Sequence, residues 1–144
     1  MRSLAAGLLL LCGCAEVAPE GGPTLVVEEN RYRVVAETIS SGEGLGVLDV
    51  RVEAAGGWHI APEAPVRLDL AAPDMTFTPA KLRAEHARKL DEDVIEWSCE
   101  LNATTPARRV ASGQLKFGIC EGDAEQCVIV RRDLQIPVAL QGAR

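Results

Sequence analysis

Residues 48–54 read LDVRVEA, and their alternation of apolar and charged side chains decides the fold class. In an extended strand Leu48, Val50 and Val52 share one face, because successive side chains point to opposite sides. A period of two residues indicates a strand with one buried and one solvated face, not a helix. This stretch therefore predicts a β-sheet with a hydrophobic core on one side.

The same alternation recurs along the chain. It is regular in VRLDL, IEWSCEL and LQIPVAL, which are residues 66–70, 95–101 and 134–140, and looser in RYRVVAETI, residues 31–39. Turn-forming stretches such as SSGEG, AAGG, APEAP, ATTPA and EGDAEQ separate these runs. The pattern predicts an all-β, immunoglobulin-like β-sandwich of seven to nine short strands.

Two segments depart from this alternation. Pro137 interrupts the last run, and since proline donates no backbone hydrogen bond, we expect an edge strand there. The segment KLRAEHARKLDED, residues 81–93, has the length for a helical turn, but its charges favour a solvated loop. Neither segment indicates a second domain.

The N-terminus has the features of an export signal. Arg2 precedes an apolar run from Leu4 to Leu11, and this run is too short to cross a bilayer, which takes about 20 residues. It fits the apolar part of a secretory signal peptide. The run continues into Leu11-Cys12-Gly13-Cys14, which resembles the signal of bacterial lipoproteins.

That resemblance implies cleavage before Cys14 and a lipid on Cys14; the alternative is an ordinary signal peptide cut nearby. The predicted organisation is a signal peptide over residues 1–13, an anchor and flexible tether over residues 14–23, and one domain over residues 24–144. Ala15 after the anchored cysteine resembles the sorting pattern for the outer membrane. We therefore expect a periplasm-facing lipoprotein of the bacterial envelope.

The charge of the chain disfavours nucleic acid as a partner. Without residues 1–13, which hold one basic and no acidic residue, 14 basic and 21 acidic residues remain, a net charge of −7. No basic stretch with interleaved aromatic residues occurs in the sequence. We expect no nucleic-acid binding and no cofactor, since the sequence has no C-x-x-C-H haem signature and no phosphate-binding Gly-rich loop.

Three cysteines remain beyond the signal and the anchor. Cys99 shares the apolar face of its strand with Trp97, so we expect it to be a buried, free thiol. Cys120 and Cys127 lie on two strands joined by EGDAEQ, and both have the parity opposite to their apolar neighbours. We therefore predict both sulfur atoms on the solvated face of one hairpin, near its end.

The sequence leaves three interpretations of this pair open. A disulfide closing so short a loop stabilises by roughly 2.5 kcal/mol, so it is a modest structural link. An exposed bridge is also open to thiol–disulfide exchange in an exported protein, although Glu121, Asp123 and Glu125 disfavour a thiolate there. Zinc is the third interpretation, but His59 and His86 are distant in sequence.

Two stretches together resemble a known family. GWHIAPEAPVRLDL, residues 57–70, and LKFGICEGDAEQCVI, residues 115–129, are similar in order and separation to segments of the N-terminal domain of thiol:disulfide interchange protein DsbD. The resemblance implies an immunoglobulin-like periplasmic domain. It also implies that Cys120 and Cys127 are its redox pair and that a thioredoxin-like protein or a membrane electron carrier is its partner.

His59, Pro62 and Pro65 match the first motif, and we interpret them as shaping the exit of a strand. The chain departs from the family in lacking an aromatic cap over the cysteines, with Phe77 as the nearest candidate. Two functions follow as hypotheses. One is a lipid-anchored thiol–disulfide oxidoreductase module that passes electrons through Cys120 and Cys127. The alternative is a non-enzymatic envelope binding lipoprotein with a structural disulfide.

Overall fold

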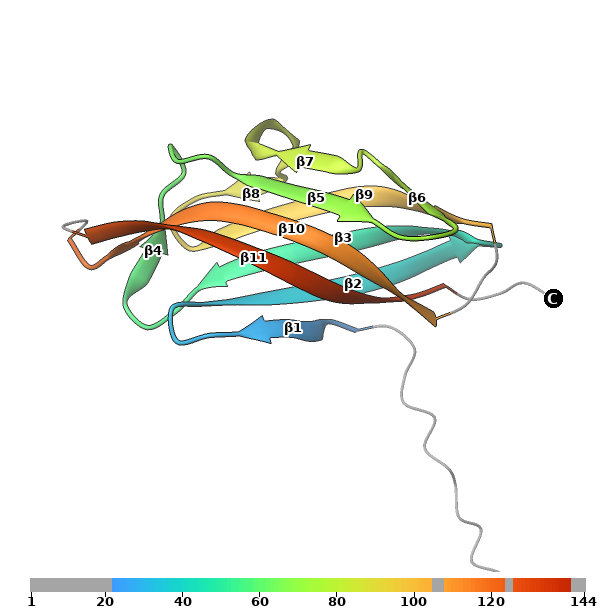
Figure 1. The fold of residues 1–144 in the computed structure, drawn as a ribbon, viewed down its shortest axis with the longest axis horizontal. Helices are drawn as coiled ribbons and strands as arrows, with labels where there is room; N and C mark the ends of the chain where they lie inside the picture. Colours follow the sequence, from blue (N-terminus) through green and yellow to red (C-terminus); the bar gives the residue numbers. More distant parts are fainter. Residues whose placement is uncertain (1–21, 105–107, 124–125, 141–144) are drawn as a thin grey trace, which may run out of the picture.

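Two antiparallel β-sheets face each other in the computed structural model, which describes residues 22–104, 108–123 and 126–140 (Figure 1). The six-stranded sheet has the order β1 (Thr24–Glu28), β2 (Tyr32–Gly42), β3 (Leu45–Ala54), β9 (Val94–Ala103) and β6 (Met75–Thr78), with β8 (Lys89–Leu90) also paired to β9. The five-stranded sheet has the order β11 (Gln126–Ala139), β10 (Arg108–Glu121), β5 (Arg67–Ala71) and β7 (Lys81–Arg83), with β4 (Trp58–Ile60) also paired to β10. The predicted all-β sandwich is confirmed, although the short strands raise the number within the described ranges above nine.

The core fills the space between the two sheets. Its largest fully buried side chains come from both of them: Trp97, Phe117, Leu48, Ile60, Leu68, Leu82, Ile95, Leu101, Ile119, Leu134, Ile136 and Val34. The indole Nε1 of Trp97 donates a hydrogen bond to the backbone oxygen of Arg83 at 2.9 Å, which satisfies its buried polar atom. Tyr32 from the six-stranded sheet meets Phe117 from the five-stranded sheet edge-on, with ring centroids 5.2 Å apart.

The alternation of the sequence survives in the burial of the strands. In β3, β9 and β11 every second residue is buried over most of the strand, including the positions predicted at 48–52, 95–101 and 134–140. Pro137 lies on β11, which is an edge strand of the five-stranded sheet, as the sequence predicted. The period of two therefore identified the core-facing side chains of these strands.

The expectation of a solvated loop over residues 81–93 is wrong in part. The segment contains β7, the short 3-10 helix η1 (Ala84–His86) and β8, and the side chain of Leu82 is fully buried. β7 pairs with β5, which β6 separates from it in sequence, and β8 pairs with the start of β9 in a short hairpin. Strands of two or three residues show no periodicity of their own, which is why the sequence did not reveal them.

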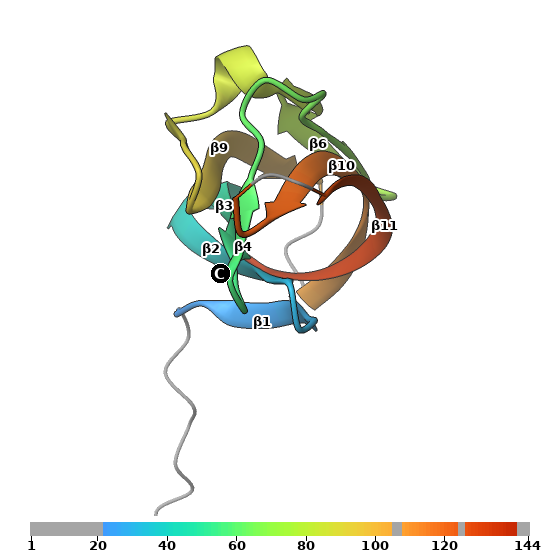
Figure 2. The same ribbon diagram turned by 90° about the vertical axis from the view of Figure 1, so that its left-hand side faces the viewer.

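The hairpin of β10 and β11 holds the predicted cysteine pair. Its register runs without a shift from Arg108 opposite Ala139 to Glu121 opposite Gln126. Figure 2 looks onto the end of the sandwich at which β4 and the cysteine-bearing ends of β10 and β11 lie together. No helix in the described ranges is long and apolar enough to cross a membrane. The predicted signal peptide and Cys14 lie outside those ranges.

Candidate functional site

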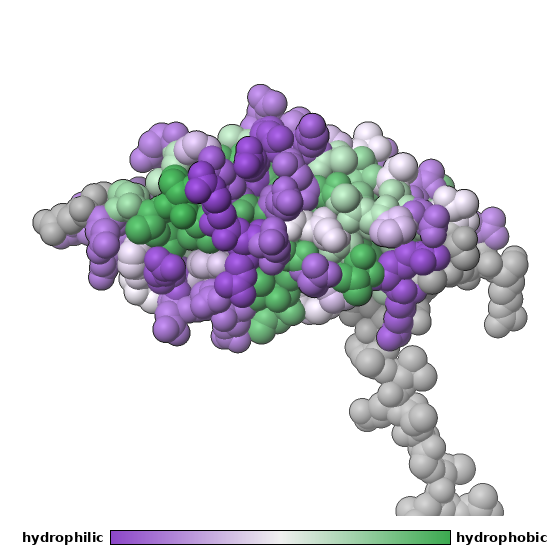
Figure 3. Space-filling view, in the orientation of Figure 1, coloured by the Kyte–Doolittle hydropathy of each residue, from purple (hydrophilic) through white to green (hydrophobic). Residues whose placement is uncertain are grey.

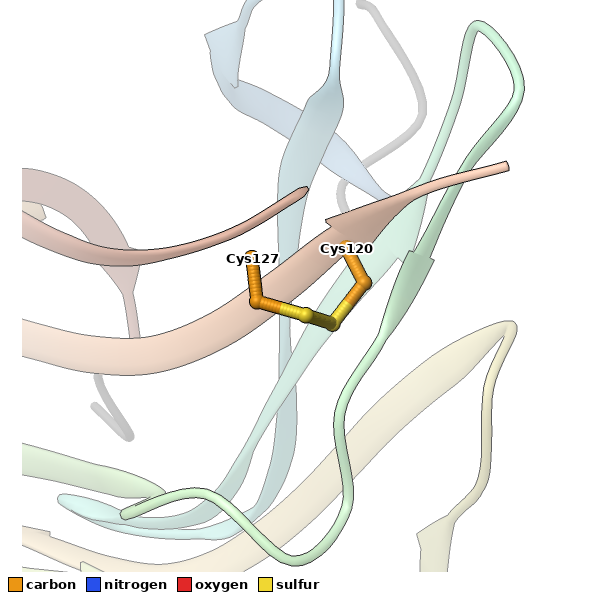
Figure 4. Close-up of a disulfide and its surroundings, with 2 residues drawn as sticks. All are labelled: Cys120 and Cys127. Atoms are coloured by element: carbon orange, nitrogen blue, oxygen red, sulfur yellow. A yellow bond between two sulfur atoms is a disulfide. The ribbon is translucent and has the colours of Figure 1, made fainter. Parts of the chain in front are cut away.

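A disulfide joins Cys120 of β10 to Cys127 of β11 (Figure 4). The two cysteines are direct register partners, and their Cα atoms are 4.0 Å apart. Because the ladder has no bulge between them and the rest of the hairpin, both side chains project to the outer face of the five-stranded sheet. The parity derived from the sequence is therefore right for both residues.

The two halves of the bridge differ in exposure. Cys127 is exposed, whereas Cys120 is only 3% exposed. The prediction that both sulfur atoms lie on a solvated face is thus wrong for Cys120. The reason is that β4 pairs with the end of β10, with Cys120 opposite His59, and the chain after β4 continues over this part of the outer face.

This covering segment, residues 57–64, is fixed to the hairpin by backbone hydrogen bonds. The amide of Ala61 donates to the oxygen of Gly118 at 2.9 Å, and the amide of Gly122 donates to the oxygen of Gly57 at 3.1 Å. In Figure 4 the same segment runs beside the disulfide. One side of the bridge is therefore held under backbone, and the other side is open.

Gly118 and Pro62 explain how the covering segment fits. A Cβ atom on Gly118 would lie 2.6 Å from the Cβ of Ala64, so a larger residue there would displace the segment. The amide of Ala64 donates to the oxygen of Ala61 at 3.1 Å, which closes a turn with Pro62 at its second position. Proline favours that position because its φ is already set. This agrees with the interpretation of Pro62 as shaping the strand exit.

His59, which the sequence motif singled out, lies beside the disulfide. It is half-buried and directly opposite Cys120 in the pairing of β4 with β10. Cys127, Cys120 and His59 therefore form one row across β11, β10 and β4, on the same face. The sequence suggested a structural histidine, and only the pairing of β4 with β10 reveals its position next to a sulfur atom.

Of the other residues that the sequence singled out, only Trp58 helps to anchor β4. Trp58 lies opposite Glu121, and the guanidinium carbon of Arg31 stands 5.2 Å from the centre of its ring. A cation over an aromatic face is attracted by the ring quadrupole. Pro65 is exposed and follows the turn. Phe77 is buried in the core, so it is not a cap over the cysteines.

Charges of both signs stand around the bridge. Glu121 and Asp123 are exposed next to it, while Glu125 lies outside the described residues. Arg132 donates a hydrogen bond to Glu29 at 2.6 Å, and this bond raises the pKa of the Arg132 guanidinium. Arg132 is thus engaged with the connection between β1 and β2, and of these two neighbouring arginines Arg131 is the one on the face of the disulfide.

Cys99 is the free thiol of the described residues and is buried in the core, as predicted. Burial, with a smaller contribution from the carboxylate of Asp49, raises the pKa of the Cys99 thiol to about 11. A thiol in this environment stays protonated at neutral pH and is a poor nucleophile. Cys99 is therefore placed for packing and is poorly suited to thiol exchange.

Metal binding finds no support in the geometry. No group of three or more His, Cys, Asp or Glu side chains that could hold a metal ion occurs within the described ranges. His59 lies in β4, while the Nδ1 atom of His86 accepts a hydrogen bond from the backbone amide of Arg83 at 2.9 Å. The two histidines thus lie in different elements of the fold, His59 in β4 and His86 in η1.

The chain was compared with protein families, curated proteins and solved structures. No protein-family model matches the chain, and no curated protein matches it. Among solved structures, the N-terminal periplasmic domain of ScsB from Proteus mirabilis is similar, with 15% sequence identity and a TM-score of 0.40. The match covers 80% of this chain and 49% of that one, so the chain spans about half the length of the ScsB structure.

Proposed function

We propose that this chain is a lipid-anchored periplasmic module that exchanges electrons with a partner protein through the Cys120–Cys127 pair. The observation that carries the proposal is the unequal exposure of the bridge, with Cys127 exposed and Cys120 almost fully buried. A disulfide is opened by a thiolate that reaches one of its sulfur atoms in line with the other. Only the Cys127 side of this bridge is open to such an approach.

The reaction would begin with attack of a partner thiolate on Sγ of Cys127. The bond between the two sulfur atoms breaks, its electron pair goes to Sγ of Cys120, and that sulfur takes up a proton. A mixed disulfide then links Cys127 to the partner. The partner's second thiolate attacks its own sulfur in this bond and releases Cys127, so the partner is oxidised and the pair is reduced. The reverse sequence would pass electrons from the reduced Cys120–Cys127 pair to an oxidised partner.

His59 supports this order of events. The leaving sulfur of Cys120 would form as a thiolate in a buried place, where a charge is costly. His59 is directly opposite Cys120 in the strand pairing, and its imidazole would be the group that donates a hydrogen bond or a proton to that sulfur. In a His59→Asn variant we expect slower reduction of the bridge by dithiothreitol, whereas His86→Asn should leave the rate unchanged. Equal rates in both variants would remove His59 from the mechanism.

The location and the partner belong to the same proposal. The apolar run before Leu11-Cys12-Gly13-Cys14 supports export and a lipid on Cys14, with Ala15 favouring the outer membrane. The resemblance of residues 57–70 and 115–129 to the N-terminal domain of DsbD supports a thioredoxin-like protein or a membrane electron carrier as partner. Mass spectrometry of the mature chain should show an acylated Cys14; an unmodified terminus beyond it would contradict the anchor.

One observation favours the alternative function, a non-enzymatic envelope binding module. The covering segment buries Cys120, and a purely structural link between the ends of β10 and β11 would look the same on that side. However, the bridge joins strands that are already paired along their whole length, so the conformational freedom it removes is small. The two functions differ in whether Cys127 reacts with another protein.

Trapping of the mixed disulfide tests the proposal. In cells that express the full chain and are quenched with acid and an alkylating agent, Cys120→Ser leaves Cys127 without its resolving partner. We expect this variant to accumulate a mixed disulfide, identified by mass spectrometry as a bond to Cys127. The matched Cys127→Ser variant keeps only the buried cysteine and should accumulate far less. If neither variant forms an adduct, the bridge is structural.

A further inference from the structure

The outer face of the five-stranded sheet carries a row of positive charge beside the disulfide. Lys116 of β10 is the register partner of Arg131 on β11 and of Arg67 on β5, and Arg67 is in turn opposite Arg83 on β7. Four basic side chains thus stand side by side across four strands, and we call them the basic row. The whole chain has a net charge of −6, so the row is a positive patch on a protein that is negatively charged overall.

The basic row is on the same face as the bridge. Lys116 precedes Cys120 by four residues and Arg131 follows Cys127 by four, so the parity is equal. Four residues of strand correspond to about 13 Å. Between the row and the bridge lies Ile129, which is 47% exposed. In Figure 3 an apolar area toward the hairpin end of this face borders a band of hydrophilic residues.

Three of the four side chains of the row have no ion pair within the described part of the chain. Arg83 bonds Asp69 at 2.8 Å, but no ion pair to Arg67, Lys116 or Arg131 occurs among the described residues. Like charges directly opposite each other on a sheet are destabilising. A row of like charges therefore costs stability, and binding of an acidic partner would account for it.

The surface at the row is also hollowed. A depression of about 220 Å³ is lined by Arg67, Lys116, Arg131 and Arg132, together with Gln114, Leu115 and Asp133. Asp133 is the one carboxylate of this lining, and the others that carry charge are basic. The depression is thus large enough to receive acidic side chains of another molecule and has the charge to attract them.

We propose that the basic row is the docking site for an acidic rim on the protein that exchanges disulfides with Cys127. This inference rests on the proposed function, because it names the chemistry of that partner: carboxylates about 13 Å from its reactive sulfur. A protein that contacts Cys127 across this face covers Ile129 and then meets the row. Attraction at that distance would raise the association rate and fix the orientation of the two sulfur atoms.

Two probes test the charge of the partner. Each is a synthetic peptide with one cysteine and, about 13 Å away in an extended chain, a cluster of either Glu or Lys. Each peptide reacts with the bridge of the full chain. That chain carries Cys12→Ser and Cys14→Ser, so its remaining cysteines are Cys120, Cys127 and the buried Cys99. The measured quantity is the second-order rate of mixed-disulfide formation at about 20 mM and at about 0.5 M salt.

The row variant combines Arg67→Gln, Lys116→Gln and Arg131→Gln. At low salt we expect it to react about tenfold more slowly than the unaltered row with the Glu peptide, and faster with the Lys peptide. At high salt both differences should vanish because the charges are screened. Rates that do not depend on the row would overturn the inference.

A control variant changes the net charge equally on the other sheet. Arg33→Gln, Arg51→Gln and Arg88→Gln remove three cations that already have acidic partners there. This control should leave both peptide rates close to those of the unaltered protein. If it slows the Glu peptide as much as the row variant does, the effect comes from total charge, and the row has no docking role.

Two further measurements separate the possible failures. Dithiothreitol is uncharged, so its rate reports the intrinsic reactivity of the bridge; a bridge that resists it contradicts the proposed function itself. If dithiothreitol reacts but the peptides show no dependence on charge, only the docking inference fails. Sedimentation with phosphatidylglycerol vesicles tests whether the row binds an anionic membrane instead of a protein. Row-dependent binding to vesicles together with row-independent peptide rates would assign the row to a membrane and overturn the inference.

Discussion

The outer faces of the two sheets differ in how their basic side chains are paired. On the six-stranded sheet basic side chains have acidic partners across strands, although the acids Glu37 and Asp49 stand opposite each other. Arg33 is opposite Glu53 and bonded to it, and Arg51 is opposite Glu96, with 3.4 Å between charged atoms. On the five-stranded sheet the basic row places Lys116 between two arginines. The first face is arranged for its own stability. The second face carries charges without such partners, which the proposed docking protein would use.

The disulfide belongs to the second face as well. Both cysteines and the basic row project from the five-stranded sheet, and the covering segment lies over the end of that sheet. The third cysteine, Cys99, is on the inner side of the six-stranded sheet and is buried. The disulfide and three basic side chains without ion pairs among the described residues therefore lie on one face, and the predictions below test whether the difference between the faces is real.

The largest effect is expected at Gly118, where the covering segment rests on β10. Gly118→Val would place side-chain atoms where Ala64 now lies, since even a Cβ there comes within 2.6 Å of it. The segment should move off, and Cys120 should become exposed. We expect the bridge to be reduced by dithiothreitol at least about tenfold faster, with a loss of about 1–3 kcal/mol in the free energy of unfolding.

Ser112→Val is the matched control for this change. Ser112 is on β10, has the same parity as Gly118 and is exposed, but it lies far from the covering segment along the strand. It should alter neither the reduction rate nor, beyond about 0.5 kcal/mol, the stability. If Gly118→Val reacts at the same rate as this control, the covering segment does not protect Cys120.

A smaller effect is expected from Cys99 at alkaline pH. Its pKa is raised to about 11 in the folded chain, so the unfolded chain loses this proton at a lower pH. The unfolded state then binds fewer protons, and the stability that Cys99 contributes, complete below the unfolded pKa, is lost as pH rises toward 11. Between pH 8 and 10.5 the free energy of unfolding should fall by about 1–2 kcal/mol more than in Cys99→Ala.

Chemical denaturation of both proteins at the two pH values measures this difference. Other groups that titrate in the range are shared, so the difference between the proteins isolates Cys99. An equal pH dependence of the two proteins would mean that the thiol is not held in a buried environment. The inner side of the six-stranded sheet would then be less closed than the structure shows.

The smallest effect concerns the charges themselves. Lys116→Glu would replace a cation between two arginines by an acid, and we expect it to stabilise the fold by about 0.5 kcal/mol. Arg51→Glu on the other sheet would put an acid opposite Glu96 and should destabilise by a similar amount. Thermal unfolding at low and at high salt measures both, and salt should shrink both changes. Changes of the same sign would contradict the contrast between the faces.

The sequence predicted the fold better than it predicted the site. Alternation of side chains identified the inward residues of the long strands, because burial on one face imposes a period of two. The same parity placed Cys120 and Cys127 on one side of a hairpin. It gave the wrong exposure for Cys120, because burial there comes from the pairing of β4 with β10, which joins residues about 60 positions apart.

The basic row could not be predicted from the sequence for a similar reason. Lys116 and Arg131 belong to one hairpin, but Arg67 and Arg83 join the row only through the pairing of β10 with β5 and of β5 with β7. No local pattern fixes the register between strands that are distant in sequence. His59 was visible as part of a motif, but its place opposite Cys120 depends on the same kind of long-range pairing.

The most direct test of the central claim is the reduction potential of the Cys120–Cys127 bridge in the full chain, equilibrated with glutathione buffers. An exchange pair that partner proteins open and close should have a potential less negative than about −300 mV, within the range that redox proteins share. We predict such a value. A potential well below about −300 mV would mean that the bridge stays closed in the cell, and it would contradict the account of this face as a site of electron exchange.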